Sequence, residues 1–395
     1  MKKISSSFIV TLGLAVFSML IGAGNLIFPL LAGMQSGNKT PIAMVGFFIT
    51  AVFLPIIGLI TMILFDGNYE VFFKRLGTIP GHLFIFTSMI ILGPLICIPR
   101  IATLSHEMIA PFIPWHFLSV ITPLSAGVFS TIFFISTFLV TYRKNKIVEI
   151  LGNIISPMLI ISLTFIFVKG IMNAQKIAVN TNTNVEVFKQ NILLGYQTLD
   201  LIGALFYASI VLNILKKTLD PEILRKPRIL VWISLKAGII GGILLGLVYI
   251  GMGFIGAYHG HGFEDINAAE LFREISFKVL DSHGAAIIAI ATLMACLSTA
   301  IAICAVLAEY IRTTLSNKTI SFALALALVL IACMPLSIAG FEQVATLTAG
   351  PITYIGYPML ITITLCNLGY KLFDFKPIKI PVITTFIVTL ISYLS

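Results

Sequence analysis

The sequence predicts an all-α polytopic membrane protein with a five-plus-five inverted-repeat fold, broken helices 1 and 6, and about 11 transmembrane helices. Hydrophobic residues occupy 58% of the 395 positions and charged residues only 10%, whereas a soluble domain typically carries ~25% charged residues. The apolar residues form runs of about 20, the length of a membrane-spanning helix rather than of a barrel strand. Glycine and polar residues interrupt two of these runs, at corresponding places in the two halves.

Apolar runs identify eleven candidate spans. They lie near residues 8–31, 41–65, 82–99, 118–140, 147–168, 191–215, 228–255, 284–308, 319–338, 342–369 and 378–394. We expect residues 1–170 to form the first repeat (spans 1–5), 191–370 the second (spans 6–10), and 371–395 an additional C-terminal span. Lys and Arg are concentrated in alternate loops, and the positive-inside rule therefore predicts a cytoplasmic N-terminus.

The composition and motifs disfavour several other classes of protein. A net charge of +9 in a soluble chain would suggest nucleic-acid binding, but these basic residues flank membrane spans and report orientation. The five cysteines all lie inside apolar runs without paired spacing, so we interpret them as packing residues. His259 and His261 form a single His-x-His pair, which supplies too few ligands for a metal site. We therefore expect no cofactor, with sodium considered below as a transported ion.

The first span contains the string Ile21-Gly-Ala-Gly-Asn-Leu-Ile-Phe-Pro29. Glycine weakens a helix and proline removes a backbone donor, so the string predicts unwinding near mid-membrane. Unwound backbone is tolerated at that depth only where it lines an enclosed or wet cavity. Gly22 and Gly24 alone would favour close helix packing, but Asn25 and Pro29 in the same run favour a binding site.

The sixth span carries a carboxylate, Asp200, inside an apolar run. Facing lipid would cost it at least ~2.5 kcal/mol, so Asp200 must face protein or water and is a functional candidate. An alternative reading, compatible with the first, is that Asp200 only caps the second half of a broken helix. Gly203 and Ala204 supply the small residues for such a break, which we expect near Asp200–Ala204.

Two interrupted helices at positions one and six predict a binding site between them at mid-membrane. The N-terminus of a half-helix presents free amides and a positive dipole end to an anion such as a carboxylate. Half-helix C-termini and loose carbonyls present negative ends to a cation. One such site can therefore hold an amino acid together with a coupling ion.

The eighth span places two adjacent hydroxyls, Ser298 and Thr299, in the middle of an apolar helix. Hydroxyl oxygens are hard ligands suited to a small cation. Membrane Ser and Thr also commonly bond to their own helix or to a neighbouring one. Their position opposite a broken first span favours the ion-binding interpretation.

Four ordered motifs resemble those of the bacterial branched-chain amino acid transport system II carriers (the LIVCS family) of the amino acid–polyamine–organocation superfamily. They are Gly22-Ala-Gly-Asn-Leu-Ile-Phe-Pro29, Gly93-Pro-Leu-Ile-Cys-Ile-Pro-Arg100, Gly195-Tyr-Gln-Thr-Leu-Asp200 and Ala295-Cys-Leu-Ser-Thr-Ala-Ile301. The resemblance runs to about residue 370 and implies a symporter that imports leucine, isoleucine and valine with sodium. It also implies the inverted-repeat fold and a location in the bacterial inner membrane.

The resemblance implies roles for particular residues. Ala23, Gly24 and Asn25, following Gly22, would offer backbone groups to the substrate carboxylate. Carbonyls from Gln197 to Gly203, assisted by Asp200, would receive the substrate ammonium. The sodium ligands would be Ser18, Ile21, Ala295, Ser298 and Thr299.

Two features depart from the family pattern. The family usually has twelve spans and this chain shows eleven. His106 lies where we expect an aromatic residue, in the segment that follows Arg100. Arg100 and Glu107 would form an outer gate pair or remain two separate surface charges.

Three rival interpretations remain. A proton-coupled carrier of the same fold, for another neutral amino acid, would use Asp200 as its titrating group. A membrane-embedded enzyme would need a catalytic motif, and the sequence contains no His-Glu-x-x-His and no Gly-x-Ser-x-Gly. A channel would need a continuous polar path, whereas the few polar residues at mid-membrane favour an occluded site.

Overall fold

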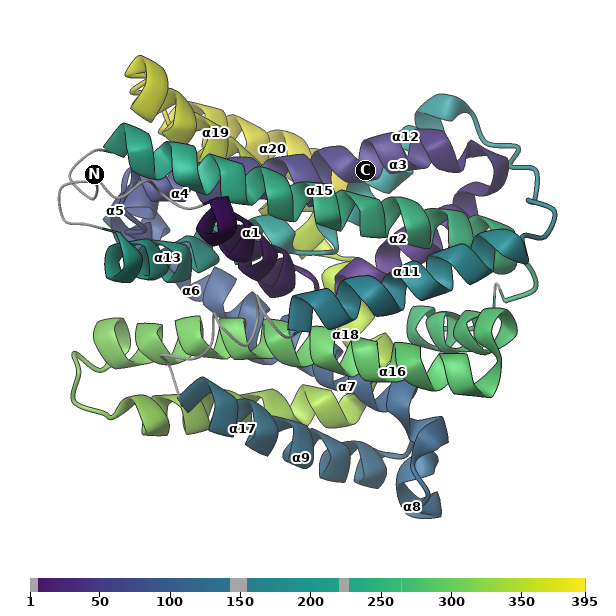
Figure 1. Cartoon of the computed structure of the whole chain (residues 1–395). Coiled ribbons are helices and arrows are strands. Elements are labelled where there is room, and N and C mark those ends of the chain that lie inside the picture. The colour runs from purple at the N-terminus through teal and green to yellow at the C-terminus, as the bar shows by residue number, and fades with distance from the viewer. Residues whose placement is uncertain (1–5, 143–154, 220–226, 264, 395) are drawn as a thin grey trace.

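Every secondary-structure element in the described part of the chain is helical. The computed structural model describes residues 6–142, 155–219, 227–263 and 265–394 (Figure 1). The helices are α1 (Ser6–Leu20), α2 (Ala23–Ser36), α3 (Thr40–Phe48), α4 (Leu54–Leu64), α5 (Tyr69–Lys74), α6 (Thr78–Ile90), α7 (Cys97–Ile109), α8 (His116–Ser119), α9 (Pro123–Tyr142), α11 (Ser156–Met172), α12 (Asn184–Tyr196), α13 (Asp200–Thr218), α15 (Pro227–His259), α16 (Ala268–Tyr310), α17 (Phe322–Ala339), α18 (Phe341–Thr348), α19 (Tyr357–Phe373) and α20 (Lys379–Leu394). The predicted all-α class is confirmed.

The predicted spans all fall on helices. In the described residues, eight helical segments are long and apolar enough to cross a membrane, and α1, α11 and α20 are shorter apolar helices. The predicted first span comprises α1 and α2, the sixth comprises α12 and α13, and the tenth comprises α18 and α19. The predicted fifth span overlaps α11, but its first residues belong to 143–154, outside the described residues. The number of crossings and the symmetry between the two repeats stay predictions.

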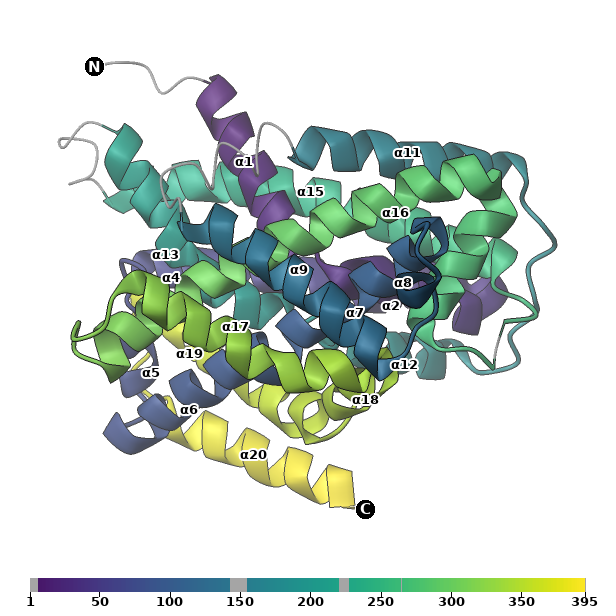
Figure 2. The ribbon, with the colours of Figure 1, turned by 90° about the horizontal axis from the view of Figure 1, so that it is seen from below.

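The outer surface of the bundle is apolar, as expected of a protein surrounded by lipid. Large side chains such as Ile161, Ile331 and Ile391 are exposed on α11, α17 and α20. Helix α20 lies at the edge of the bundle, beside α19 (Figure 2). The assignment of this last span as an addition to two five-span repeats stays a prediction.

Helix α15 packs against both α1 and α2, the two pieces of the first span. The contact with α2 is a contact of backbones. A Cβ added to Gly33 would lie 1.7 Å from the carbonyl oxygen of Gly253, and one added to Gly256 would lie 1.9 Å from that of Leu30. Small residues permit such an approach between membrane helices. This packing holds α2 beside the centre of the protein.

We expect the substitution Gly33→Ala to destabilise the fold, because the new methyl group would meet backbone that has no rotamer with which to yield. Overpacking of this kind typically costs ~1–3 kcal/mol. The measurement is the thermal unfolding of the purified protein in detergent. Gly356→Ala is the matched control, since a Cβ there would meet no atom within 4 Å. Equal stability of the two variants would show that α2 and α15 separate without cost.

Candidate functional site

The first span breaks between α1 and α2. Helix α1 ends at Leu20 and α2 begins at Ala23, while Gly22 between them has extended backbone (φ −121°, ψ −163°). The Asn25 side chain closes the break, because its Oδ1 accepts the Gly22 N–H at 2.9 Å. The interruption therefore lies within the glycine string of the sequence, and Asn25 folds back onto it.

The sixth span breaks directly before Asp200, next to the expected Asp200–Ala204. Those residues form the first turn of α13, and the non-helical segment is Gln197–Leu199. Leu199 turns the chain with a left-handed conformation (φ 63°, ψ 19°), which costs a non-glycine residue ~1–2 kcal/mol. Its side chain is buried, so packing offsets part of this strain.

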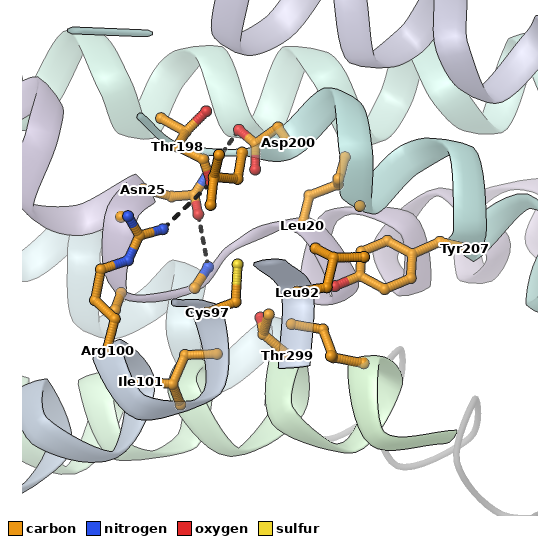
Figure 3. Close-up of a pocket in the computed structure, with 16 residues that line it drawn as sticks. Leu20, Asn25, Leu92, Cys97, Arg100, Ile101, Thr198, Asp200, Tyr207 and Thr299 are labelled. Carbon is orange, nitrogen blue, oxygen red and sulfur yellow. Dashed lines mark hydrogen bonds between the residues drawn. The ribbon is translucent and has the colours of Figure 1, made fainter. Parts of the chain in front are cut away.

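The two breaks are joined by a buried hydrogen-bond network of Asn25, Asp200 and Tyr249 (Figure 3 shows the first two). Asp200 Oδ2 accepts from Asn25 Nδ2 at 2.7 Å and from the Tyr249 hydroxyl at 2.8 Å. Asn25 Nδ2 also lies within hydrogen-bond distance of the Tyr249 hydroxyl. The carboxylate stands at the first residue of α13, where the helix dipole favours negative charge. Both readings of Asp200 thus describe its position.

Arg100 on α7 points into the same region. Gly93 leaves helical geometry (φ −90°, ψ −111°) and is followed by Pro94, and α7 begins after this kink. Arg100 is only 3% exposed. Its Nη1 donates to the carbonyl of Gln197 at 2.8 Å. Its Nη2 donates to the carbonyl of Thr198 at 3.4 Å (Figure 3). The kink therefore turns a cation toward the break in the sixth span.

The predicted outer gate pair of Arg100 and Glu107 is wrong. Glu107 forms its ion pair with Arg273 of α16, while Arg100 bonds to backbone carbonyls inside the bundle. Because the residues are seven positions apart on one helix, about 10 Å along its axis, Arg100 reaches the site and Glu107 reaches a different neighbour.

A small cavity of about 20 Å³ lies between the two breaks, with room for roughly one water molecule. Of the predicted substrate residues, Gly22, Ala23, Gly24, Asn25, Asp200 and Gly203 line it. Gln197 does not line it, and only its carbonyl takes part, through Arg100. The apolar lining comprises Leu20, Leu92, Ile101, Leu199, Tyr207 and Ile303.

The predicted sodium ligands gather beside this cavity. The Ser298 hydroxyl lies 2.8 Å from the Ser18 carbonyl and 2.7 Å from the Ala295 carbonyl. The Thr299 hydroxyl lies 2.9 Å from the Ile21 carbonyl. Both hydroxyls therefore cross from α16 to the broken end of α1, and Ser298 also bonds to its own helix.

These five residues bring together three backbone carbonyls and two hydroxyls, an oxygen set suited to a hard monovalent cation. The Ser18 hydroxyl is buried close by and has no hydrogen-bond partner among the described residues. In the same part of the chain no group of three or more His, Cys, Asp or Glu side chains is arranged to hold a metal. His259 instead contacts the Gly170 carbonyl.

Sequence reasoning missed three residues of the site. Arg100 was assigned to the outer surface although it ends a run interrupted by Gly93-Pro94, a signal of a bent span. Tyr249 was not singled out, and its only signal is a polar hydroxyl in the middle of an apolar span. No feature of the sequence marks Tyr357 as a site residue. Its hydroxyl accepts a hydrogen bond from the Leu201 N–H of α13 at 2.9 Å.

Comparison with known proteins supports a transporter with this fold. The chain is 28% identical over 392 residues to the branched-chain amino acid permease BrnQ of Bacillus subtilis, covering 95% of this chain and 84% of that protein. It is 27% identical over 402 residues to a putative branched-chain amino acid carrier protein of Staphylococcus aureus (strain USA300), covering 97% and 87%.

The fold of this chain is similar to that of membrane transporters whose structures have been solved. The nucleobase-cation-symport-1 family transporter Mhp1, in a closed conformation with bromovinylhydantoin bound, matches with a TM-score of 0.57 at 15% identity, covering 97% of this chain and 91% of that one. A mutant of the Eremococcus coleocola manganese transporter matches with a TM-score of 0.61 at 15% identity, covering 99% and 88%.

These relatives and structural neighbours are membrane transporters rather than enzymes. The sequence model of the family described as branched-chain amino acid transport protein matches residues 5–395. The chain is thus a multi-pass membrane protein and a member of the branched-chain amino acid transport protein family.

Proposed function

We propose that the protein is a secondary active symporter that imports leucine, isoleucine and valine together with sodium by alternating access. It would act in the bacterial inner membrane with its N-terminus in the cytoplasm. The observation that carries the proposal is the pocket between two helix breaks, with an oxygen cluster directly beside it. Thr299 belongs to both, since it lines the pocket and bonds to the Ile21 carbonyl.

The pocket suits a zwitterion with an apolar side chain. The first amides of α2, at Ala23 and Gly24, have no acceptor within their own helix, as at any helix N-terminus. Such amides and the positive end of the dipole favour a carboxylate. Asp200 and the carbonyls that end α12 favour an ammonium group. Leucine and isoleucine side chains on the walls favour a branched aliphatic substrate.

The adjoining oxygen cluster supports coupling to sodium. Ile21 belongs to the break that forms one wall of the pocket, and its carbonyl is also one of the proposed ion ligands. An ion bound there would order the break, so that the substrate then binds with a smaller ordering cost. Such coupling is reciprocal and typically amounts to ~1–3 kcal/mol.

We expect purified protein in liposomes to accumulate leucine when a sodium gradient is directed inward. Without sodium, uptake should fall to the level of empty liposomes. Isoleucine and valine should compete with labelled leucine, whereas lysine and glutamate should not, because the apolar walls offer no partner for a second charge. Sodium-independent uptake of leucine would contradict the coupling, and no uptake of any branched-chain amino acid would contradict the substrate class.

A proton-coupled carrier of the same fold for another neutral amino acid is the second candidate. The observation that favours it is the buried Asp200 carboxylate, which lines the pocket between the two breaks. In the liposome assay this candidate predicts uptake that follows an inward proton gradient and ignores sodium. The two gradients, applied separately, therefore distinguish the candidates.

A further inference from the structure

Arg100 is a buried cation whose hydrogen-bond partners are all neutral. Its guanidinium bonds to the carbonyls of Gln197 and Thr198, and its Nε has no partner among the described residues. No acidic side chain in this part of the chain forms an ion pair with it. The Asp200 carboxylate is near enough to attract the guanidinium electrostatically, but its Oδ2 bonds to Asn25 and Tyr249 instead. A buried charge that lacks a directly bonded counter-charge is costly. The arrangement therefore favours an anion that arrives from outside the chain.

The guanidinium lies against the start of α2. A Cβ added to Gly24 would be 2.7 Å from Arg100 Nη2, so only a glycine gives the arginine this position. The Phe28 ring on the next turn is 5.2 Å from the guanidinium carbon. The first amides of α2 and the guanidinium thus face the same cavity, and an anion placed there would meet donors from both.

We infer that Arg100 binds the carboxylate of the transported amino acid, together with the first amides of α2. This inference rests on the proposed transport of amino acids. A planar guanidinium fork matches a carboxylate with two parallel hydrogen bonds and adds geometric specificity. The nearby Asp200 carboxylate would then face the ammonium end of the same molecule.

Substrate entry requires Arg100 to move. The cavity of about 20 Å³ is too small for a leucine molecule, and the guanidinium holds the carbonyls of Gln197 and Thr198. In binding, the guanidinium would exchange these carbonyls for the substrate carboxylate. The carbonyls that it leaves would accept from the substrate ammonium. Before the substrate arrives, Arg100 thus hydrogen-bonds to the carbonyls of Gln197 and Thr198. Once the substrate is present, the same side chain binds the substrate carboxylate.

The test compares leucine with leucinamide, which keeps the ammonium group and the side chain but lacks the negative charge. Binding to purified protein is measured by calorimetry at saturating sodium and about pH 6.5, where both amines are mainly protonated. In the natural protein we expect leucinamide to bind about 10- to 100-fold more weakly than leucine. Arg100→Gln should lower leucine affinity by a similar factor and leave leucinamide affinity unchanged or higher. The preference for leucine should therefore shrink to the part that the first amides of α2 supply.

Arg100→Lys should keep part of the preference, because it retains the charge and loses the fork. Arg75→Gln is the control, since Arg75 bonds to the Asn367 side chain and carbonyls elsewhere and should leave both affinities as they are. Equal loss of both ligands in Arg100→Gln, with normal unfolding temperature or not, would assign Arg100 a packing role and overturn the inference. So would equal binding of the two ligands to the natural protein. Failure of that protein to bind leucine at all would instead overturn the proposed function.

Discussion

Replacing Gly24 by leucine should abolish the binding of branched-chain amino acids while the protein still inserts and folds. The new side chain would enter the cavity between the helix breaks, which has a volume of about 20 Å³ and is lined by Gly24 itself. It would also meet Arg100 and the Phe28 ring, which lie 2.7 and 3.2 Å from the position of a Cβ. The measurement is leucine binding to the purified variant, with size-exclusion chromatography as the test of folding.

A graded series separates pocket blockage from helix damage. Gly24→Ala adds one methyl group, and its nearest neighbour is the far end of the flexible Arg100 side chain, which can yield. We therefore expect the alanine variant to bind leucine more weakly but measurably. Gly356→Leu places the same bulk where a Cβ meets no atom within 4 Å, and it should bind normally. Wild-type affinity in Gly24→Leu would show that Gly24 serves only helix packing.

Removing both hydroxyls of α16, in the double variant Ser298→Ala with Thr299→Val, should weaken sodium binding. Their oxygens face the carbonyls of Ser18 and Ile21 at the end of α1. Through coupling of typically ~1–3 kcal/mol, leucine affinity at fixed sodium should fall roughly 5- to 150-fold. Much of the loss should be recovered at high sodium, because the defect lies in ion affinity. The measurement is leucine affinity as a function of sodium concentration.

Thr292→Val provides the matched control for this experiment. Thr292 is a buried threonine on the same helix, and its hydroxyl has no hydrogen-bond partner among the described residues. Its removal should leave the sodium dependence unchanged. If the double variant also keeps the natural dependence, the two hydroxyls only link α16 to α1. If leucine affinity follows pH instead of sodium in every protein, the ion is a proton and Asp200 becomes the group to replace.

The sequence predicted the features that depend on local chemistry. The break in the first span follows from Gly22, Gly24 and Asn25, which lie within four positions of one another, and the apolar runs alone located the helices. The break in the sixth span lies directly before the expected Asp200–Ala204 and not at its glycine, Gly203. The structure uses Leu199 instead, and a leucine in left-handed conformation depends on tertiary packing that no local pattern reveals.

The parts of the site that the sequence did not reveal depend on long-range register. Tyr249 meets Asn25 across 224 positions of the chain, and an apolar helix carries no mark of which face will turn inward. Arg100 occupies the end of an apolar run, where a charge ordinarily reaches the membrane surface. Only the kink at Gly93-Pro94 directs it inward. To predict the position of Arg100, one would need to know the angle of this kink as well as its location in the sequence.

Helix α15 packs across the break in the first span and contacts the helices on both sides of it. It is continuous from Pro227 to His259, and it also packs closely on α1, where a Cβ added to Gly13 would lie 2.7 Å from the Ile240 side chain. A break in one helix is therefore not a free hinge, because its two pieces share one rigid support. For α1 to swing while α2 stays in place, it must slide along or detach from α15. The two pieces of the first span are therefore tied to each other through α15 as well as through the break itself.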